Sequence, residues 1–105
     1  MRALIFVIFM LASGIASADT AKYCDQIERF RIWANGSDTY GVWVEYGSHP
    51  ETCPGGFYLP HESANKHYVM SFLLAEKAQG NTVCMQVVTT SVISGRCKVN
   101  YVYNP

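Results

Sequence analysis

Four cysteines spread along a short chain constrain the fold more than any other feature of this sequence. They are Cys24, Cys53, Cys84 and Cys97, in a chain of 105 residues. An even number of cysteines in a small exported domain is typical of a disulfide framework. A domain of this size buries little apolar surface, so crosslinks contribute much of its stability. The sequence therefore predicts two disulfides, and the three possible pairings all stay open at this point.

The amino terminus indicates that the chain is exported. A short basic start is followed by an uncharged apolar run led by "LIFVIFML" and by small residues that end in an A-x-A cleavage site at Ala18. This is the organisation of a secretory signal peptide, and its apolar core is too short for a membrane-spanning helix of about 20 residues. We therefore expect residues 1–18 to be removed and residues 19–105 to form one disulfide-stapled domain, secreted or periplasmic and not inserted in a membrane.

Charge and residue spacing argue against several classes of function. The eight basic and eight acidic residues are scattered singly, so the chain has no basic stripe for nucleic acid and no basic amphipathic segment for a membrane surface. The cysteines lack the paired C-x2-C of zinc sites and the C-x-x-C of thioredoxin-like proteins. His61 and His67 do not have the i, i+4 spacing of a helical metal pair. Because no acid, base, nucleophile or metal constellation is found, we expect no enzyme, no cofactor and no metal site.

Alternation of apolar and polar residues predicts a mostly β domain with five short strands. The predicted strands are residues 27–33, 39–46, 57–60, 81–90 and 96–103. An N-G pair between the first two is a strong hairpin signal. In the last strand the alternation places Cys97, Val99, Tyr101 and Tyr103 on one face.

One helix is expected between the third and fourth strands, over Tyr68–Ala78. Ser63 or Asn65 would cap its start with a side-chain oxygen, and Gly80 would end it, because glycine tolerates the left-handed conformation. The resulting order, β-β-β-α-β-β, is that of the OB-fold, a small five-stranded Greek-key barrel.

The expected helix is apolar nearly all round. Met70, Leu74 and Ala78 form one stripe at 3.6-residue spacing, and Val69 and Leu73 form a second. A helix of this kind is usually buried on more than one side. The barrel can cover one stripe, and either loops or a neighbouring subunit would cover the other. The first stripe therefore supplies candidate contacts of a homo-oligomer.

Three aromatic residues, Trp33, Tyr40 and Trp43, are candidate ligand contacts. Aromatic faces beside amide and charged groups suit the apolar face and polar edge of a sugar ring, and they also occur at protein interfaces. Trp43 alternates with Val42 and Val44, so it should point outward if those two point into the core. The alternative is that a loop or a second subunit covers Trp43.

Three segments resemble a class of small exported bacterial proteins of uncharacterised role. The segments are "CPGGFYLP", "SFLLAEKAQGNTV" and "GRCKVNYVY". Such proteins look like single OB-fold domains with a helix ending "LLxAKAxG" and a cysteine opening the fifth strand; here Glu76 stands where that pattern has alanine. More distantly, they are similar to the B subunits of AB5 toxins of the subtilase-cytotoxin and pertussis type, in which a ring of OB-fold subunits binds host glycans. No binding residue of those toxins is carried over to this chain.

The resemblance implies a disulfide pairing and a function. Parallel third and fifth strands would bring Cys53 to Cys97 and leave Cys24 for Cys84, with a local Cys84–Cys97 pair as the alternative. The implied function is a secreted binding module for a carbohydrate or a protein partner, ring-forming like a toxin B subunit. The alternative is a periplasmic structural or inhibitory protein that binds a protein partner and no small ligand.

Overall fold

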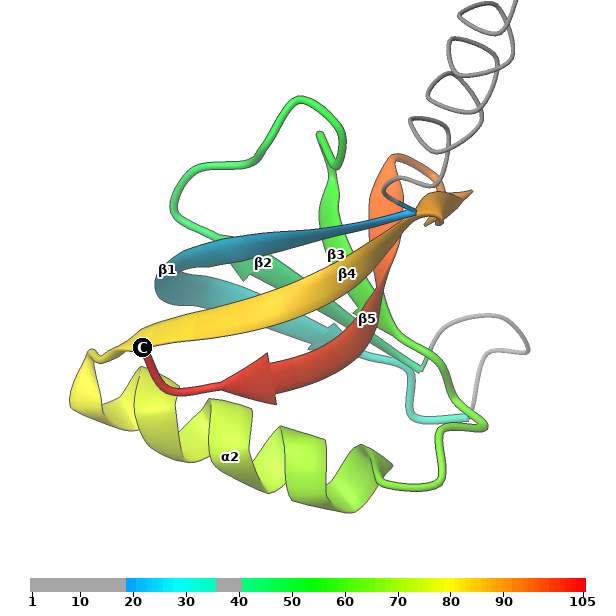
Figure 1. Ribbon diagram of the computed structural model, residues 1–105. Helices are drawn as coiled ribbons and strands as arrows, with labels where there is room; N and C mark the ends of the chain where they lie inside the picture. The colour runs from blue at the N-terminus through cyan, green and yellow to red at the C-terminus, as the bar shows by residue number, and fades with distance from the viewer. Residues whose placement is uncertain (1–18, 36–40) are drawn as a thin grey trace, which may run out of the picture.

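The computed structural model describes residues 19–35 and 41–105 and shows a mostly β protein with one helix (Figure 1). The elements are β1 (Thr20–Ile32), β2 (Val42–Tyr46), β3 (Gly56–Leu59), α2 (Lys66–Gln79), β4 (Thr82–Ile93) and β5 (Arg96–Tyr103). Their order along the chain is the predicted one. The expected signal peptide and Tyr40 lie outside the described residues. No helix in the described ranges is long and apolar enough to span a membrane.

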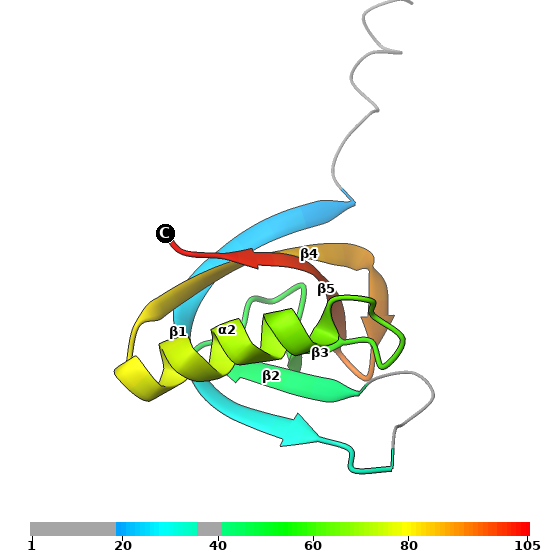
Figure 2. The ribbon, with the colours of Figure 1, turned by 90° about the horizontal axis from the view of Figure 1, so that it is seen from below.

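The order of the strands in space differs from their order along the chain, because β5 lies between β3 and β4. The pairing runs β1-β2-β3-β5-β4, and β4 also pairs with β1, so the sheet closes on itself. The β3–β5 pair is parallel and the other four pairs are antiparallel. Seen from below, α2 crosses one end of the closed sheet (Figure 2).

Alternate side chains of the strands fill the interior of the closed sheet. In β2, Val42, Val44 and Tyr46 are buried, whereas Trp43 and Glu45 between them are only half-buried. This is the period-2 pattern of a strand with one face in the core, and it confirms that Trp43 points away from the interior. The core continues with Ile27, Phe57, Leu59, Val83, Met85, Val87 and Val99, and α2 adds Leu73.

A β-bulge in β5 overturns the predicted alternation of that strand. The register between β4 and β5 skips Asn100, which is an extra residue in β5. A one-residue shift moves every later side chain to the other face. Val99, before the bulge, faces the core as predicted, whereas after the bulge Val102 packs against the core and Tyr101 is 42% exposed. The prediction that placed Tyr101 on the face of Cys97 and Val99 is wrong.

Two disulfides brace the sheet. Cys24 and Cys84 face each other across the antiparallel β1–β4 pair, with their Cα atoms 4.0 Å apart. Cys53 precedes β3 and Cys97 opens β5, and the parallel β3–β5 pairing brings their Cα atoms to 5.4 Å. These are the two pairs that the resemblance implied, and the alternative Cys84–Cys97 pair is not formed.

Candidate functional site

Helix α2 packs Leu73 and its half-buried neighbours against the core, and these neighbours include Met70 from the stripe that was expected to meet a second subunit. Leu73 is 0% exposed. Val69, Met70 and Phe72 are half-buried and pack against the core beside it. On the other side Tyr68 is 79% exposed, Leu74 is 48% exposed, and Ala78 is also exposed. The loops of the described chain therefore do not cover the stripe that includes Leu74 and Ala78.

The ends of α2 are only partly as predicted. Gly80 ends the helix in the left-handed conformation, with φ 69°. Asn65 occupies the N-cap position, but its side chain makes no capping hydrogen bond. The main chain turns into the helix through a hydrogen bond from the Lys66 N–H to the Ser63 carbonyl, 3.3 Å long. The predicted side-chain cap by Ser63 or Asn65 is therefore wrong.

A groove on the β2 side of α2, here called the Trp33 groove, has a volume of ≈ 540 Å³. It brings together Trp33, a predicted ligand contact, with Met70 and Leu74, two predicted oligomer contacts. Ala78 does not line it. The remaining lining residues are Ile32, Ala34, Asn35, Gly41, Val42, Leu59, Pro60, His61, Lys66 and His67. This lining is largely apolar and contains one lysine and two histidines but no carboxylate.

A second groove, here called the Tyr68 groove, lies between α2 and β5 and has a volume of ≈ 510 Å³. Its lining residues are Leu59, Ser63, Ala64, Asn65, Tyr68, Val69, Phe72, Val99, Asn100, Tyr101 and Val102. None of them carries a charge. The sequence pattern predicts no site here, because alternation along β5 places Tyr101 on the face of Cys97 and Val99 and does not reveal the bulge at Asn100.

Trp43 lies outside both grooves, on the outer face of β2. The guanidinium carbon of Arg96 lies 3.3 Å from the centre of the Trp43 ring, and that of Arg31 lies 5.3 Å away. The Trp33 ring meets Trp43 edge-on, with the ring centres 4.7 Å apart. A guanidinium over an indole face is a favourable cation–π arrangement. It also occupies the surface on which a sugar would stack, so a ligand-contacting Trp43 requires that Arg96 move.

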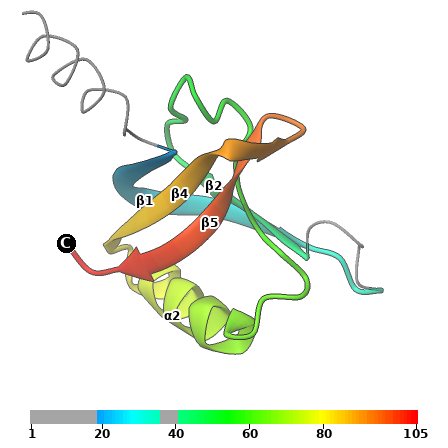
Figure 3. The same ribbon diagram turned by 45° about the vertical axis from the view of Figure 1, so that its right-hand side comes forward.

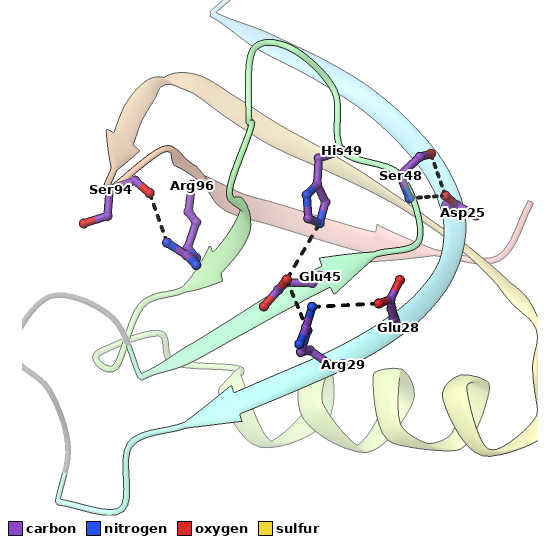
Figure 4. A network of polar contacts seen from close by, with 8 residues as sticks. All are labelled: Asp25, Glu28, Arg29, Glu45, Ser48, His49, Ser94 and Arg96. Atoms are coloured by element: carbon purple, nitrogen blue, oxygen red, sulfur yellow. Dashed lines mark hydrogen bonds and ion pairs between the residues drawn. The ribbon is translucent and has the colours of Figure 1, made fainter.

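Polar side chains beside this cluster pair with one another (Figure 4). Glu45 lies 3.3 Å from the Arg29 guanidinium and 4.0 Å from His49. Asp25 accepts hydrogen bonds from the backbone N–H and the hydroxyl of Ser48, at 3.2 and 3.0 Å. The backbone N–H of Gln26, followed by Ser48, lowers the pKa of Asp25 below its usual value. The Arg29–Glu45 pair joins β1 to β2, whereas the contacts of Ser48 and His49 tie the loop after β2 to the sheet.

Within residues 19–35 and 41–105, no group of three or more His, Cys, Asp or Glu side chains is arranged to hold a metal ion. No protein-family model, curated protein or solved structure matches the chain. The function is therefore inferred from the geometry alone.

Proposed function

We propose that this protein is an exported, non-catalytic binding module that recognises a carbohydrate through the surface beside α2. The supporting observation is the distribution of exposed apolar side chains. Among the described residues, four of the five large hydrophobic side chains that are exposed line the two grooves: Ile32 and Leu74 in the Trp33 groove, Tyr68 and Tyr101 in the Tyr68 groove. Exposed apolar surface that is gathered rather than scattered marks a binding surface.

The proposal includes an OB-type Greek-key barrel as the fold. The closed order of five strands, the parallel β3–β5 pair and the helix between β3 and β4 support it. OB-folds commonly bind ligands on the face of their second and third strands. Here that face carries Trp43 beneath Arg96, whereas the grooves flank α2. The fold alone does not give the ligand, so the proposal rests on the grooves.

The two disulfides and the lack of a membrane-spanning helix in the described ranges are compatible with an extracellular or periplasmic protein. Carbohydrates are the ligand class favoured by the grooves, because both combine aromatic side chains with amide groups. Sugar rings present an apolar C–H face and a hydroxyl-rich edge, and aromatic and amide groups match these two features.

A second candidate function is binding of a protein partner or a further copy of the chain through the outer stripe of α2. The observation that favours it is the exposure of Leu74 and Ala78 on the stripe that Met70 begins. Such a stripe on a helix is usually covered in the functional assembly. A ring of subunits around their helices, as in the toxin B subunits, would be one form of this assembly.

A glycan array probed with the exported, oxidised protein tests the first proposal, and light scattering on the same sample tests the second. Carbohydrate recognition predicts reproducible binding to at least one class of glycan, and a blank array would refute it. A native mass of several subunits that falls to one subunit in Leu74→Glu would support the second function. A single-subunit mass that is unchanged in this variant would count against self-association.

A further inference from the structure

We propose that the Tyr68 groove is a binding site for a neutral saccharide. This inference rests on the proposed function and deepens it by naming the site and the class of ligand. The groove lies between the first two turns of α2 and the second half of β5, which run close to each other in two views (Figures 1 and 3). Its volume, ≈ 510 Å³, lies within the range of sites that bind small molecules.

Aromatic side chains from two different elements line this groove. Tyr68 comes from α2 and is 79% exposed, Tyr101 comes from β5 and is 42% exposed, and Phe72 is half-buried between α2 and the core. The Tyr101 ring also packs beside Tyr103, with the ring centres 5.8 Å apart, and the remaining exposed parts of Tyr68 and Tyr101 provide apolar surface. A ring with an apolar face would therefore bury surface against the two tyrosines without displacing any protein group.

Neutral polar groups accompany the aromatic side chains. Asn65 has an amide that makes no capping hydrogen bond. Asn100 donates one amide N–H to the Gln86 side chain at 2.6 Å, which fixes the amide and leaves its second N–H and its carbonyl for other partners. An amide both donates and accepts hydrogen bonds, as do the hydroxyls of a sugar. The groove thus offers both partners that a hydroxyl-rich edge requires.

The absence of charge in the lining decides between neutral and acidic saccharides. None of the residues that line the Tyr68 groove is Lys, Arg, His, Asp or Glu, whereas Lys66 and two histidines line the Trp33 groove. An acidic sugar would lose part of its hydration in the Tyr68 groove and gain no ion pair in return. A neutral saccharide has no such cost, so the groove favours it.

The β-bulge explains why the site exists at all. If Asn100 were a regularly paired residue of β5 instead of a bulge, alternation from the core-facing Val99 would turn Tyr101 toward the interior. The bulge turns Tyr101 outward beside α2, and the bulge residue itself supplies an amide to the groove. Bulges often aim a side chain at a binding site, and here one insertion supplies two of the proposed contacts.

The test uses the exported, oxidised protein and an array of neutral oligosaccharides built from glucose, galactose and N-acetylhexosamines, together with sialylated and uronate-containing ones. Titration calorimetry then measures the affinity of the best-binding neutral saccharide for variants. Tyr68→Ala and Tyr101→Ala are expected to weaken binding roughly three- to tenfold each, the loss of one aromatic contact. Both side chains are exposed, so the variants retain the fold. Val92→Ala is the matched control, because Val92 is a large hydrophobic residue that is 43% exposed and lines neither groove.

A second measurement reads the site directly. In the NMR spectrum of labelled protein, the side-chain amide signals of Asn65 and Asn100 are expected to shift on addition of the neutral saccharide. Three results would overturn the inference. Unchanged affinity in both tyrosine variants would exclude the site, and binding of acidic saccharides alone would exclude the ligand class; both outcomes leave the proposed function intact. A blank array would refute the inference and the proposed carbohydrate function together.

Discussion

The clearest perturbation compares two neighbouring leucines of α2 that differ in burial. Leu73 is 0% exposed in the core, and Leu74 is 48% exposed. Leu73→Ala removes a fully buried side chain and leaves a cavity, which costs about 2–5 kcal/mol. Leu74→Ala removes a side chain that packs little and places alanine in a helix, which costs less than about 0.5 kcal/mol. The same substitution one residue apart is therefore expected to differ in its cost by at least about 1.5 kcal/mol.

Urea unfolding followed by tryptophan fluorescence measures this difference. With an m-value of about 1–1.5 kcal/mol/M for a small domain, Leu73→Ala should lower the midpoint by more than about 1 M, and Leu74→Ala should leave it nearly unchanged. Equal losses in the two variants would refute the placement of α2. A loss in Leu74→Ala that grows with protein concentration would show instead that a second subunit buries the outer stripe, because assembly links stability to concentration.

Three further predictions concern the core, the cation–π cluster and the disulfides. Burial, followed by the Asp25 charge, raises the pKa of Tyr46 above its usual value of 10.0. Above that pH the unfolded state loses the phenol proton while the folded state keeps it, so the unfolding free energy should fall as pH rises above 10.0. The fall should be less steep in Tyr46→Phe, which has no phenol proton to lose. Arg96→Ala should cost about 1 kcal/mol and increase acrylamide quenching of tryptophan, whereas Arg31→Ala, which removes the more distant guanidinium, should do neither. Reduction of both disulfides, which close loops of 60 and 44 residues, should remove about 4 kcal/mol each and unfold the domain in a circular-dichroism melt; an unchanged melting temperature would contradict their structural role.

The element order could be predicted from sequence because most strands have one face in the core. In β2 the alternation of Val42, Val44 and Tyr46 with half-buried residues was sufficient. The first strand was predicted too short. Its first half, from Thr20, pairs with β4, and its second half pairs with β2. The first half carries Asp25 on the same face as the buried Ile27, which obscures a core-facing pattern. Tertiary pairing rather than propensity therefore sets where β1 begins.

The surroundings of Trp43 could be predicted only in part. The alternation of β2 gives its outward direction, but Arg96 belongs to β5, which is separated from β2 in the chain by β3, α2 and β4. It reaches Trp43 because β5 inserts between β3 and β4 and brings Arg96 level with Gly56. A contact of this kind depends on the closure of the sheet. No local pattern in the sequence contains it.

The sequence predicts some residues of the Trp33 groove as candidate contacts but none of the Tyr68 groove. Trp33 is a candidate because it is aromatic, and Leu74 is a candidate because of its helical spacing. The sequence does not show that the two lie in one groove. Alternation places Tyr101 on the face of Cys97 and Val99, because it assumes that no residue is inserted in the strand. The insertion of Asn100 breaks that assumption at the position where an aromatic side chain leaves the core for the surface. A departure from ideal alternation that exposes a large aromatic ring has a cost in buried area, and a ligand that covers the ring would offset that cost.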